Sequence, residues 1–490
     1  MTAPKSSDAA KSVRGALAWS FAERYLSLLI TVPSTMILAR LLTPTQVGVY
    51  SLCAVVTNLA SILRDFGVSE YLIQERELDR DKLRSAFTIT LMMAWGLALI
   101  IFLGRHLLAS YYHEPLLADL LLVLCLNFVM LPLASPSFAL LNREMAFHTV
   151  CVVQVSANLA NAATSIFLAW HGHGALSLAW GPVAGIAMQV VILVWLRPRE
   201  ALLWPRLRGA GRQLRFGAMF TASRLVESGS RNGHELIIGK QFGFTSLGLF
   251  SRATGLIDLL ATTVSSAVLR VATPAFAADH RAGHSLVAPY AKGTAIYSGV
   301  AWPFFGGVAL LSHDVLALLF GAQWVEAAPL ATLLAIAALP YALTVLAPNA
   351  LAATGNVKRR LTVALWYGPL HLACVLVASF WSLQAVAAVF LIGNLVQTLL
   401  YTHHLTTVLQ ARPRELFAPS WASAKLALGC CAGLALAELA CAEWSLPLLP
   451  RLLVCIAAGT LSWIACAHWL HHPVMGEVRR ALSHLRSRHA

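Results

Sequence analysis

Long apolar stretches recur along the whole chain, and short polar connections separate them. Each stretch has about 20 residues, the length at which an α-helix crosses the hydrocarbon core of a bilayer. The pattern predicts an all-α integral membrane protein with about 14 transmembrane helices, at residues 16–40, 46–66, 85–104, 117–141, 147–170, 174–196, 215–239, 245–269, 288–311, 326–350, 360–380, 383–405, 421–440 and 447–469. Very short connections such as 171–173 indicate that neighbouring helices form antiparallel hairpins.

The seventh predicted span, 215–239, is the most polar of these stretches. Beyond its first residue, its ionisable residues are Arg224, Glu227, Arg231, His234 and Glu235. Each charge at the middle of a membrane costs about 2.5–3.5 kcal/mol on insertion scales, so hydropathy alone would argue against this span. The distribution of basic residues in the loops is the second criterion.

With fourteen spans, 26 of the 36 Lys and Arg residues fall on one side of the membrane, four fall on the other, and six lie within spans. Loops rich in Lys and Arg face the cytoplasm. Without the seventh span, the basic loop 358–360 and the carboxyl tail would move to the opposite side. The asymmetry therefore predicts that the seventh span crosses the membrane and that both termini are cytoplasmic.

Composition supports the membrane assignment. Apolar residues make up 58% of the 490 residues and charged residues only 12%, which is too few to cover the surface of soluble domains. The same values exclude a disordered chain, collagen and a small disulfide scaffold. The net charge of +14 would suggest nucleic acid as the partner of a soluble protein. Here the basic residues are spread over all cytoplasmic loops, so they indicate orientation in the membrane, and we expect no nucleic-acid partner.

An internal repeat relates the two halves of the chain. Residues 39–51 read ARLLTPTQVGVYS and residues 239–251 read GKQFGFTSLGLFS, at an offset of 200. The same offset pairs Arg24 with Arg224, and Pro136 of the fourth span corresponds to Pro348 of the tenth. Six spans separate the two copies, an even number, so the repeats have the same orientation.

The repeat predicts two six-helix bundles followed by an extra helix pair. The predicted boundaries are 1–15 for a cytoplasmic tail, 16–196 and 215–405 for the bundles, 197–214 for a basic linker, 421–469 for the extra pair, and 470–490 for a basic amphipathic tail. Two homologous bundles are typical of transporters that work by alternating access. The amphipathic tail is expected to lie on the inner leaflet.

Ionisable groups inside the spans are functional candidates. The basic ones that could bind an anionic headgroup are Arg24, Arg224, Arg231 and Arg252. The accompanying acids, which could couple transport to an ion, are Glu23, Glu227, Glu235 and Asp258. A guanidinium group suits phosphate because it binds in a bidentate manner and stays charged. The helical spacings of Arg224–Glu227 and Arg231–Glu235 leave a second interpretation open, in which these pairs only neutralise each other.

Other polar residues indicate structure more than chemistry. Neutral polar side chains in spans two, five, six and twelve could hydrogen-bond between helices or contact sugar hydroxyls: Asn58, Gln154, Asn158, Asn161, Gln189, Asn394 and Gln397.

The nine cysteines show no metal-binding spacing, and the histidine pairs have no carboxylate neighbours. No catalytic motif, nucleotide-binding loop or Asp-rich metal–diphosphate motif occurs in the sequence, so we expect no cofactor, no metal and no enzymatic activity.

Several motifs in order resemble one known family. These are Trp19 with Arg24, ARLLTPTQVGVY (39–50), LRDFGVSEYLIQ (63–74), Arg231-Asn232 with IIGK (237–240), LGLFSRA (247–253) and GAQWVEAAPL (321–330). In these motifs the chain resembles the polysaccharide transporter family, the Wzx-like branch of the multidrug/oligosaccharidyl-lipid/polysaccharide (MOP) exporter superfamily. The resemblance covers nearly the whole chain, but it is poor at indicating the substrate.

The resemblance implies a fold of two six-helix bundles with two extra helices. It also implies a flippase that moves undecaprenyl-diphosphate-linked oligosaccharide from the inner to the outer leaflet of the inner membrane, for exopolysaccharide, capsule or O-antigen. Arg24, Arg231 and Arg252 match basic positions of the family, which meet the diphosphate or acidic sugars. His234 departs from the family, which often has Asp there, so this His could carry protons or simply pack between helices.

The function that we expect is therefore a lipid-linked oligosaccharide flippase, with a polysaccharide polymerase and co-polymerase as possible protein partners. A multidrug or cation antiporter of the same superfamily is the first alternative, although it would favour an acidic or aromatic cavity. A membrane-embedded polymerase or ligase is the second alternative, and it would need a large reactive outer loop, whereas the longest outer connections are near 105–116 and 312–325.

Overall fold

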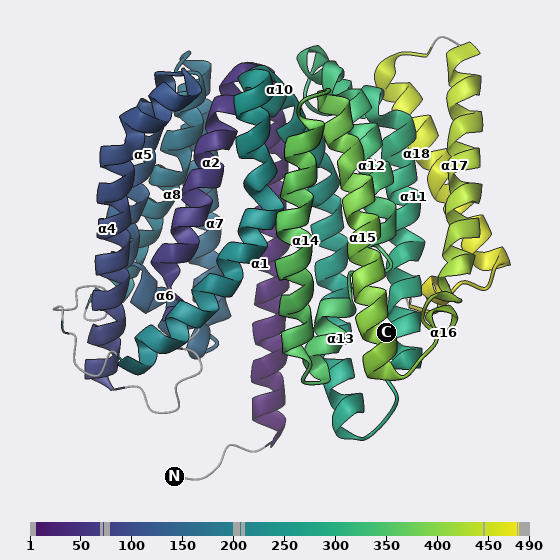
Figure 1. Ribbon diagram of the computed structural model, residues 1–490, viewed down its shortest axis with the longest axis horizontal. Helices are drawn as coiled ribbons and strands as arrows, with labels where there is room; N and C mark the ends of the chain where they lie inside the picture. The colour runs from purple at the N-terminus through teal and green to yellow at the C-terminus, as the bar shows by residue number, and fades with distance from the viewer. Residues whose placement is uncertain are drawn as a thin grey trace. The chain divides into compact units, whose positions relative to one another are not determined.

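A computed structural model describes residues 6–68, 72, 79–198, 206, 211–443, 446–477 and 479. Every element found among these residues is helical. The contacts divide the chain into two compact units, which are unit 1 (Met1–Gly248) and unit 2 (Leu249–Ala490). Within each unit most of the helices run along one another as long rods (Figure 1), as expected for antiparallel hairpins.

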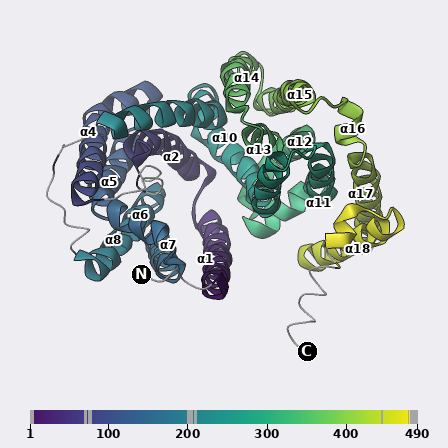
Figure 2. The ribbon, with the colours of Figure 1, turned by 90° about the horizontal axis from the view of Figure 1, so that it is seen from below.

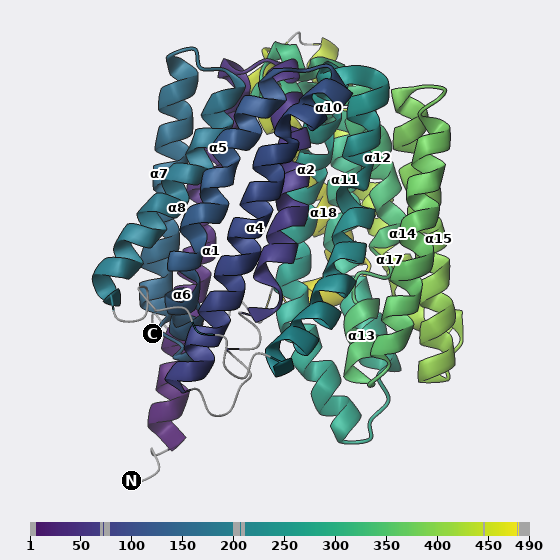
Figure 3. The same cartoon turned by 60° about the vertical axis from the view of Figure 1, so that its left-hand side comes forward.

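Among its described residues, unit 1 has seven long helical segments and two short helical pieces. Their bounds are α1 (Ser6–Leu41), α2 (Pro44–Asp65), α4 (Arg80–Tyr112), α5 (Leu116–Met130), η1 (Leu131–Leu133), α6 (Ser135–Arg143), α7 (Phe147–Trp170), α8 (Ala175–Leu196) and the first part of α10 (Gly211–Arg281). Seen end-on, α1 lies against α7 (Figure 2), and α7 runs beside α8 (Figure 3).

Unit 2 continues from α10. Its elements are α11 (Val287–Leu319), η2 (Ala322–Ala327), α12 (Ala328–Tyr341), α13 (Ala347–Ala353), α14 (Val357–Ala378), α15 (Leu383–Leu409), α16 (Pro413–Phe417), α17 (Ser420–Glu443) and α18 (Leu448–Trp469). The last two form an antiparallel pair that packs against α11. The predicted extra helix pair at 421–469 corresponds to α17 and α18.

Twelve helical segments of the described chain are long and apolar enough to cross a membrane. They confirm the multi-pass all-α class. The twelve do not include α1, which covers the predicted first span, and they count the 58 residues Arg224–Arg281 as one segment. The exact number of fourteen spans and the cytoplasmic placement of both termini stay predictions.

A break at Gly243 divides α10 where the sequence predicts the boundary between spans seven and eight. Gly243 has φ 77° and ψ 177°, a backbone conformation that side-chain-bearing residues rarely adopt. The part of α10 before this break packs within unit 1, since the Tyr112 hydroxyl donates a hydrogen bond to the Leu236 carbonyl oxygen at 3.1 Å. The boundary between the compact units along the chain therefore falls after Gly248, because contacts keep the seventh predicted span with the first six. The predicted linker 197–214 stays a prediction. The division into two six-helix repeats stays a prediction.

The repeat segments predicted from the sequence contact each other at equivalent positions. The hydroxyl oxygens of Thr45 and Thr245 lie 2.7 Å apart, and these residues are related by the offset of 200. A Cβ atom at Gly48 would lie 1.8 Å from the Phe244 carbonyl oxygen, and one at Gly248 would lie 1.9 Å from the Pro44 carbonyl oxygen. Glycine at both positions therefore allows two backbones to approach closely, as small residues do in membrane helices.

The fourth predicted span, 117–141, is not one continuous helix. It is α5, the 3₁₀ turn η1 and α6, and the change of geometry falls in a segment that contains Pro132 and Pro136. The Trp95 indole N–H of α4 donates to the Val129 carbonyl oxygen at 3.3 Å. Membrane helices tolerate such breaks only when another group satisfies the freed backbone.

The tenth predicted span, 326–350, is broken more extensively, into η2, α12 and α13. Four side chains from α11 and α15 donate to carbonyl oxygens around the turn at 342–346. They are Trp302 to Leu339 at 2.8 Å, Asn394 to Ala337 at 2.8 Å, Thr398 to Pro340 at 3.0 Å, and Tyr290 to Leu343 at 3.0 Å. For Asn394, the structure shows a bond between helices, which is the first of the two predicted roles.

Exposed tryptophans mark the ends of the apolar helices in each unit. Trp170 and Trp195 stand at the ends of α7 and α8, while Trp381 follows α14 and Trp469 ends α18. All four are mostly exposed. Tryptophan is enriched where membrane meets water, so its placement agrees with helices that span a bilayer.

Candidate functional site

Glu23 on α1 is the acceptor at the end of a chain of hydrogen bonds. The Ser27 hydroxyl donates to Glu23 Oε1 at 3.1 Å, and Asn158 Nδ2 of α7 donates to the Ser27 hydroxyl oxygen at 2.9 Å. Gln154 Nε2, one turn earlier on α7, donates to Asn158 Oδ1 at 3.3 Å. All three donors point toward the carboxylate, so their dipoles stabilise its negative charge. The chain joins α1 to α7.

Arg24 is the next residue on α1, and the helix turns it about 100° away from Glu23. Its side chain is exposed. Among the residues that the structure describes, no hydrogen bond or ion pair involves its guanidinium group. Arg24 therefore has its hydrogen-bond donors available for an anion, while the neighbouring carboxylate is engaged with α7.

Arg231 on α10 is paired with Glu227, whereas the sequence spacing suggested a pair with Glu235. Its Nη2 atom lies 4.0 Å from Glu227 Oε1, an i,i+4 pair on one helix face. Both side chains are more than half exposed, and exposed pairs of this kind contribute about 0–1 kcal/mol. Such a weak pair can be exchanged for a stronger anion. Arg224 on the same helix is exposed, and Glu235 is half-buried.

His234 lies on the packed face of α10. Only 5% of its surface is exposed, and Ile238 one turn later is fully buried. The burial fits the interpretation of His234 as a helix-packing residue better than that of a residue open to substrate.

Arg252 belongs to unit 2, and aromatic rings surround it. Its guanidinium carbon lies 5.2 Å from the centre of the Trp324 ring and 5.5 Å from that of Phe320, within the range of cation–π attraction. Trp324 is fully buried. Arg252 therefore has packing partners in unit 2 that Arg24 lacks in unit 1. Asp258, two turns further along α10, is exposed.

The structure thus distributes the nine predicted site residues over separate groups. Glu23 joins Ser27 and α7, Arg231 joins Glu227, and Arg252 joins two rings. The sequence reading did not single out Ser27, Phe320 or Trp324. Ser27 could have been found, because it lies one helical turn after Glu23 on the same face, and Trp324 is part of the GAQWVEAAPL motif.

Electrostatic pairing outside the spans fixes the ends of helices in unit 1. Arg197, directly after α8, donates from Nη1 to Glu144 Oε1 at 2.9 Å and from Nη2 to Oε2. The hydrogen bonds from Arg197 hold the pKa of the Glu144 carboxyl below its usual value. Glu144 precedes α7, so this bidentate pair ties the α6–α7 turn to the end of α8.

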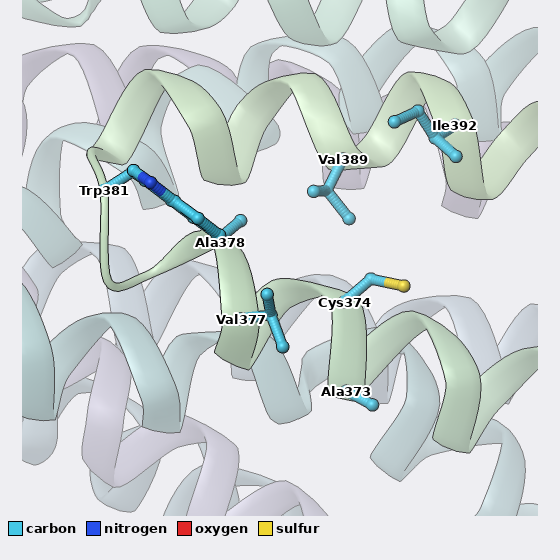
Figure 4. Close-up of a pocket in the computed structure, with 7 residues that line it drawn as sticks. All are labelled: Ala373, Cys374, Val377, Ala378, Trp381, Val389 and Ile392. Atoms are coloured by element: carbon cyan, nitrogen blue, oxygen red, sulfur yellow. The ribbon is translucent and has the colours of Figure 1, made fainter.

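A groove between α14 and α15 in unit 2 has a different character (Figure 4). Its volume is about 330 Å³, and apolar side chains with one thiol line it, among them Cys374, Val377, Trp381 and Ile392. None of the side chains that line this groove is charged, so it offers no ion-pair partner to a charged headgroup. Within the described part of the chain, no group of three His, Cys, Asp or Glu side chains could hold a metal ion.

Comparison with known proteins agrees with the membrane fold. A family profile described as "Polysaccharide biosynthesis protein" matches residues 37–329, which is more than half of the chain. The chain belongs to this family. The match confirms the resemblance to polysaccharide transporters.

Curated relatives of the polysaccharide biosynthesis family include three whose names indicate related roles. The lipopolysaccharide biosynthesis protein WzxC of Escherichia coli (strain K12) is 24% identical over 331 residues, which cover 67% of either chain. The teichuronic acid biosynthesis protein TuaB of Bacillus subtilis (strain 168) is 23% identical, over 66% of this chain and 68% of TuaB. The succinoglycan biosynthesis transport protein ExoT of Rhizobium meliloti (strain 1021) is 23% identical, over 67% of this chain and 66% of ExoT.

Solved structures show the fold of this family member. A lipid II flippase, MurJ, in an inward closed conformation has a TM-score of 0.76, at 13% identity, over 94% of this chain and 99% of MurJ. A multidrug resistance MATE transporter of the MOP superfamily, in an inward-facing conformation, has a TM-score of 0.60, at 14% identity, over 79% of this chain and 96% of the MATE chain. The chain is therefore a multi-pass membrane protein with the fold of the MOP superfamily.

Proposed function

We propose that the protein is a flippase for an undecaprenyl-diphosphate-linked oligosaccharide. It moves this precursor of an exopolysaccharide, a capsule or O-antigen across the inner membrane by alternating access. Membership of the polysaccharide biosynthesis family supports this function, as do relatives named for transport and for lipopolysaccharide biosynthesis. The bilayer is its environment, and the polymerase and co-polymerase of the same polysaccharide are its proposed protein partners.

The observation that carries the proposal is the state of Arg24. A guanidinium group within a membrane span raises the free energy of insertion unless an anion or another partner binds it. Arg24 is exposed, and no acid among the described residues pairs with it. A diphosphate offers oxygens that match the planar fork of Arg bidentately. Arg24 would therefore bind the headgroup of the lipid-linked substrate.

The other three arginines have graded roles in this proposal. Arg231 would exchange its long contact with Glu227 for the diphosphate, and Arg224 would assist from the same helix. Arg252 would act least directly, since Phe320 and Trp324 already hold its guanidinium group.

Glu23 is the best of the proposed ion-coupling residues. Proton binding would neutralise the carboxylate that three aligned donors stabilise, and it would thereby weaken the connection between α1 and α7. Because Glu23 and Arg24 are adjacent on α1, a change of charge on one residue changes the field at the other. Glu227, His234, Glu235 and Asp258 are the alternative coupling residues.

The multidrug or cation antiporter is the alternative function. Its support is the fold likeness to a MATE transporter, which does not extend to substrate. A cation substrate would be repelled by an unpaired guanidinium group on α1, so Arg24 favours an anionic substrate. The polymerase or ligase alternative has weaker support, since the named relatives are transporters and biosynthesis proteins.

Substitution of Arg24 in a strain that lacks the chromosomal gene tests the proposal. We expect Arg24→Ala to reduce surface polysaccharide at least tenfold and to cause the lipid-linked precursor to accumulate, whereas Arg24→Lys retains part of the activity. Arg80→Ala is the matched control, because Arg80 is equally exposed but lies at the start of α4. Full export by Arg24→Ala at normal protein abundance would overturn the anion-binding role. Increased resistance to cationic drugs on expression would instead favour the antiporter.

A further inference from the structure

Two residues near the carboxyl end of the chain, Trp463 and His472, pack against helix α11 at Gly299. Pro303 lies inside α11, four residues after Gly299, and it has no N–H to donate to the Gly299 carbonyl. The Trp463 indole N–H of α18 donates to this carbonyl oxygen at 2.8 Å. The lost helical hydrogen bond thus becomes a docking point for α18.

The imidazole of His472 occupies the space left by the missing Cβ of Gly299. A Cβ at this position would lie 2.4 Å from the ring carbon Cε1 of His472. His472 follows α18, and only 2% of its surface is exposed. Its ring therefore anchors the segment 470–477 against α11, and the neighbouring Val474 is also buried.

The hydrogen bonds of His472 show which nitrogen of its ring carries the hydrogen. The Val474 backbone N–H lies 3.2 Å from Nδ1, and because this N–H can only donate, Nδ1 must be the acceptor. Nε2 lies 2.9 Å from the hydroxyl of Ser423 on α17, and that hydroxyl donates to the Ala295 carbonyl oxygen at 3.1 Å. Nε2 therefore carries the hydrogen, and the docked ring is neutral.

A second proton on His472 would oppose this arrangement. It would sit on Nδ1 and face the Val474 N–H, so that an acceptor would become a second donor. Burial disfavours the charged ring and holds the pKa of His472 below its usual value. The docked state is therefore fully stable above about pH 6.5, the usual pKa of His, and loses stability as the pH falls below that value.

The segment 470–477 has several other ionisable groups near it, and none of them bonds to the His472 ring. Lys292 of α11 pairs with Glu477 at 3.3 Å, and both side chains are partly exposed. Glu415 of α16, together with Lys292, lines a groove that Pro473 borders. Lys425 on α17 and His471 are exposed, and His468 of α18 lies 3.4 Å from Arg479. The two groups hydrogen-bonded to the His472 ring are uncharged.

We propose that residues 470–477 form a latch on α11 and α17 that protonation of His472 releases. The ligand of this site is a proton, and the device responds to acidification on the side of the membrane where α18 ends. It is independent of the transported substrate, because no residue proposed to bind the headgroup takes part.

The test measures how far a cysteine at position 474 is protected from a maleimide. The full-length Val474→Cys protein in liposomes is labelled at pH 7.5 and at pH 5.5. Each rate is divided by the rate for the same protein denatured at that pH, which removes the effect of thiol ionisation. We expect protection to fall at least fivefold at pH 5.5, and to stay constant when His472→Gln is added. Unchanged protection in the chain with His472, or equal loss in the His472→Gln chain, would overturn the proposal.

Two further variants separate the histidine from its neighbours. Lys292→Met removes the ion pair with Glu477, and we expect the pH dependence to remain, whereas its loss would assign the response to that pair. If His472→Gln does not yield a folded monodisperse protein, Ser423→Ala replaces it as the second comparison. This variant should lower protection at both pH values, because Nε2 loses its acceptor, and unchanged protection at both pH values would contradict the docking contact.

Discussion

The fourth predicted span, in unit 1, and the tenth predicted span, in unit 2, are both broken helices. They occupy corresponding places in the predicted repeat. In each unit a tryptophan on the preceding long helix donates to a backbone carbonyl near the break, Trp95 to Val129 and Trp302 to Leu339. The break in unit 1 is a single 3₁₀ turn, η1, and only Trp95 supports it from another helix among the hydrogen bonds described. The break in unit 2 extends over 342–346 and has three further donors, Tyr290, Asn394 and Thr398.

The difference shows how the length of a break determines the polar side chains around it. A short 3₁₀ turn keeps most of its own hydrogen bonds, as Ala134 N–H to Leu131 O at 2.9 Å illustrates. In the longer turn, the backbone bond from Ala342 to the Leu339 carbonyl stretches to 3.3 Å, and Trp302 supplies a shorter one. Water is absent from the hydrocarbon core, so other helices must provide the donors.

The largest expected effect comes from removing two donors of unit 2 together. Tyr290→Phe with Trp302→Phe leaves the carbonyls of Leu343 and Leu339, in and just before the 342–346 turn, without their side-chain partners, while an aromatic ring is kept at both positions. We expect a loss of about 2 kcal/mol in the free energy of unfolding, because each bond in a membrane protein contributes about 0.6–1.7 kcal/mol. Unfolding of the purified protein in mixed detergent and SDS, followed by circular dichroism, measures this loss. An unchanged midpoint would mean that the side chains do not stabilise the break.

An intermediate effect is expected for Asn394→Leu in unit 2. The substitution removes the amide that donates to the Ala337 carbonyl at 2.8 Å, and we expect a loss of about 1 kcal/mol in the same measurement. Gln397→Leu is the matched control, because Gln397 is an amide on the same helix that makes no hydrogen bond in the described structure. Equal losses from both substitutions would show that the effect is not specific to the broken helix.

The smallest effect is expected in unit 1. Trp95→Phe removes a hydrogen bond of 3.3 Å from a side chain that is 52% exposed, so we expect a loss of less than about 0.5 kcal/mol. Circular dichroism of the SDS-induced unfolding again gives the value. A loss as large as that of the unit 2 double variant would remove the proposed difference between the two breaks.

Arg24 and Arg252 also differ in the partners that each unit provides for a similar residue. Both are arginines inside predicted spans, and the sequence assigns them the same role. In the structure, Arg24 is exposed and makes no ion pair among the described residues, while Arg252 lies over Trp324 and Phe320. Their distinct surroundings predict that Arg24 is the more important of the two for binding an anion.

Most of the helices were predictable because their signal is local. An apolar run of about 20 residues predicts a spanning helix wherever it occurs, and the helices α7, α8, α15 and α18 begin and end within a few residues of the predicted spans. The breaks within the fourth and tenth spans were not predicted. Pro136 and Pro348 lie in these spans, and proline cannot donate the helical hydrogen bond. The local sequence does not reveal which distant side chains will satisfy the freed carbonyls.

The sequence by itself determined that this chain spans a membrane many times, which family it resembles, and which charges lie inside the spans, because hydrophobic length and residue identity are local properties. Only the tertiary structure decided which partner each charge has. It joined Ser27, the donor to Glu23, to Asn158 across 131 positions of the chain. It also paired Arg231 with Glu227 and packed His472 against Gly299. The physical reason is that hydrogen bonds and burial depend on distances between helices, which are fixed only when the helices pack.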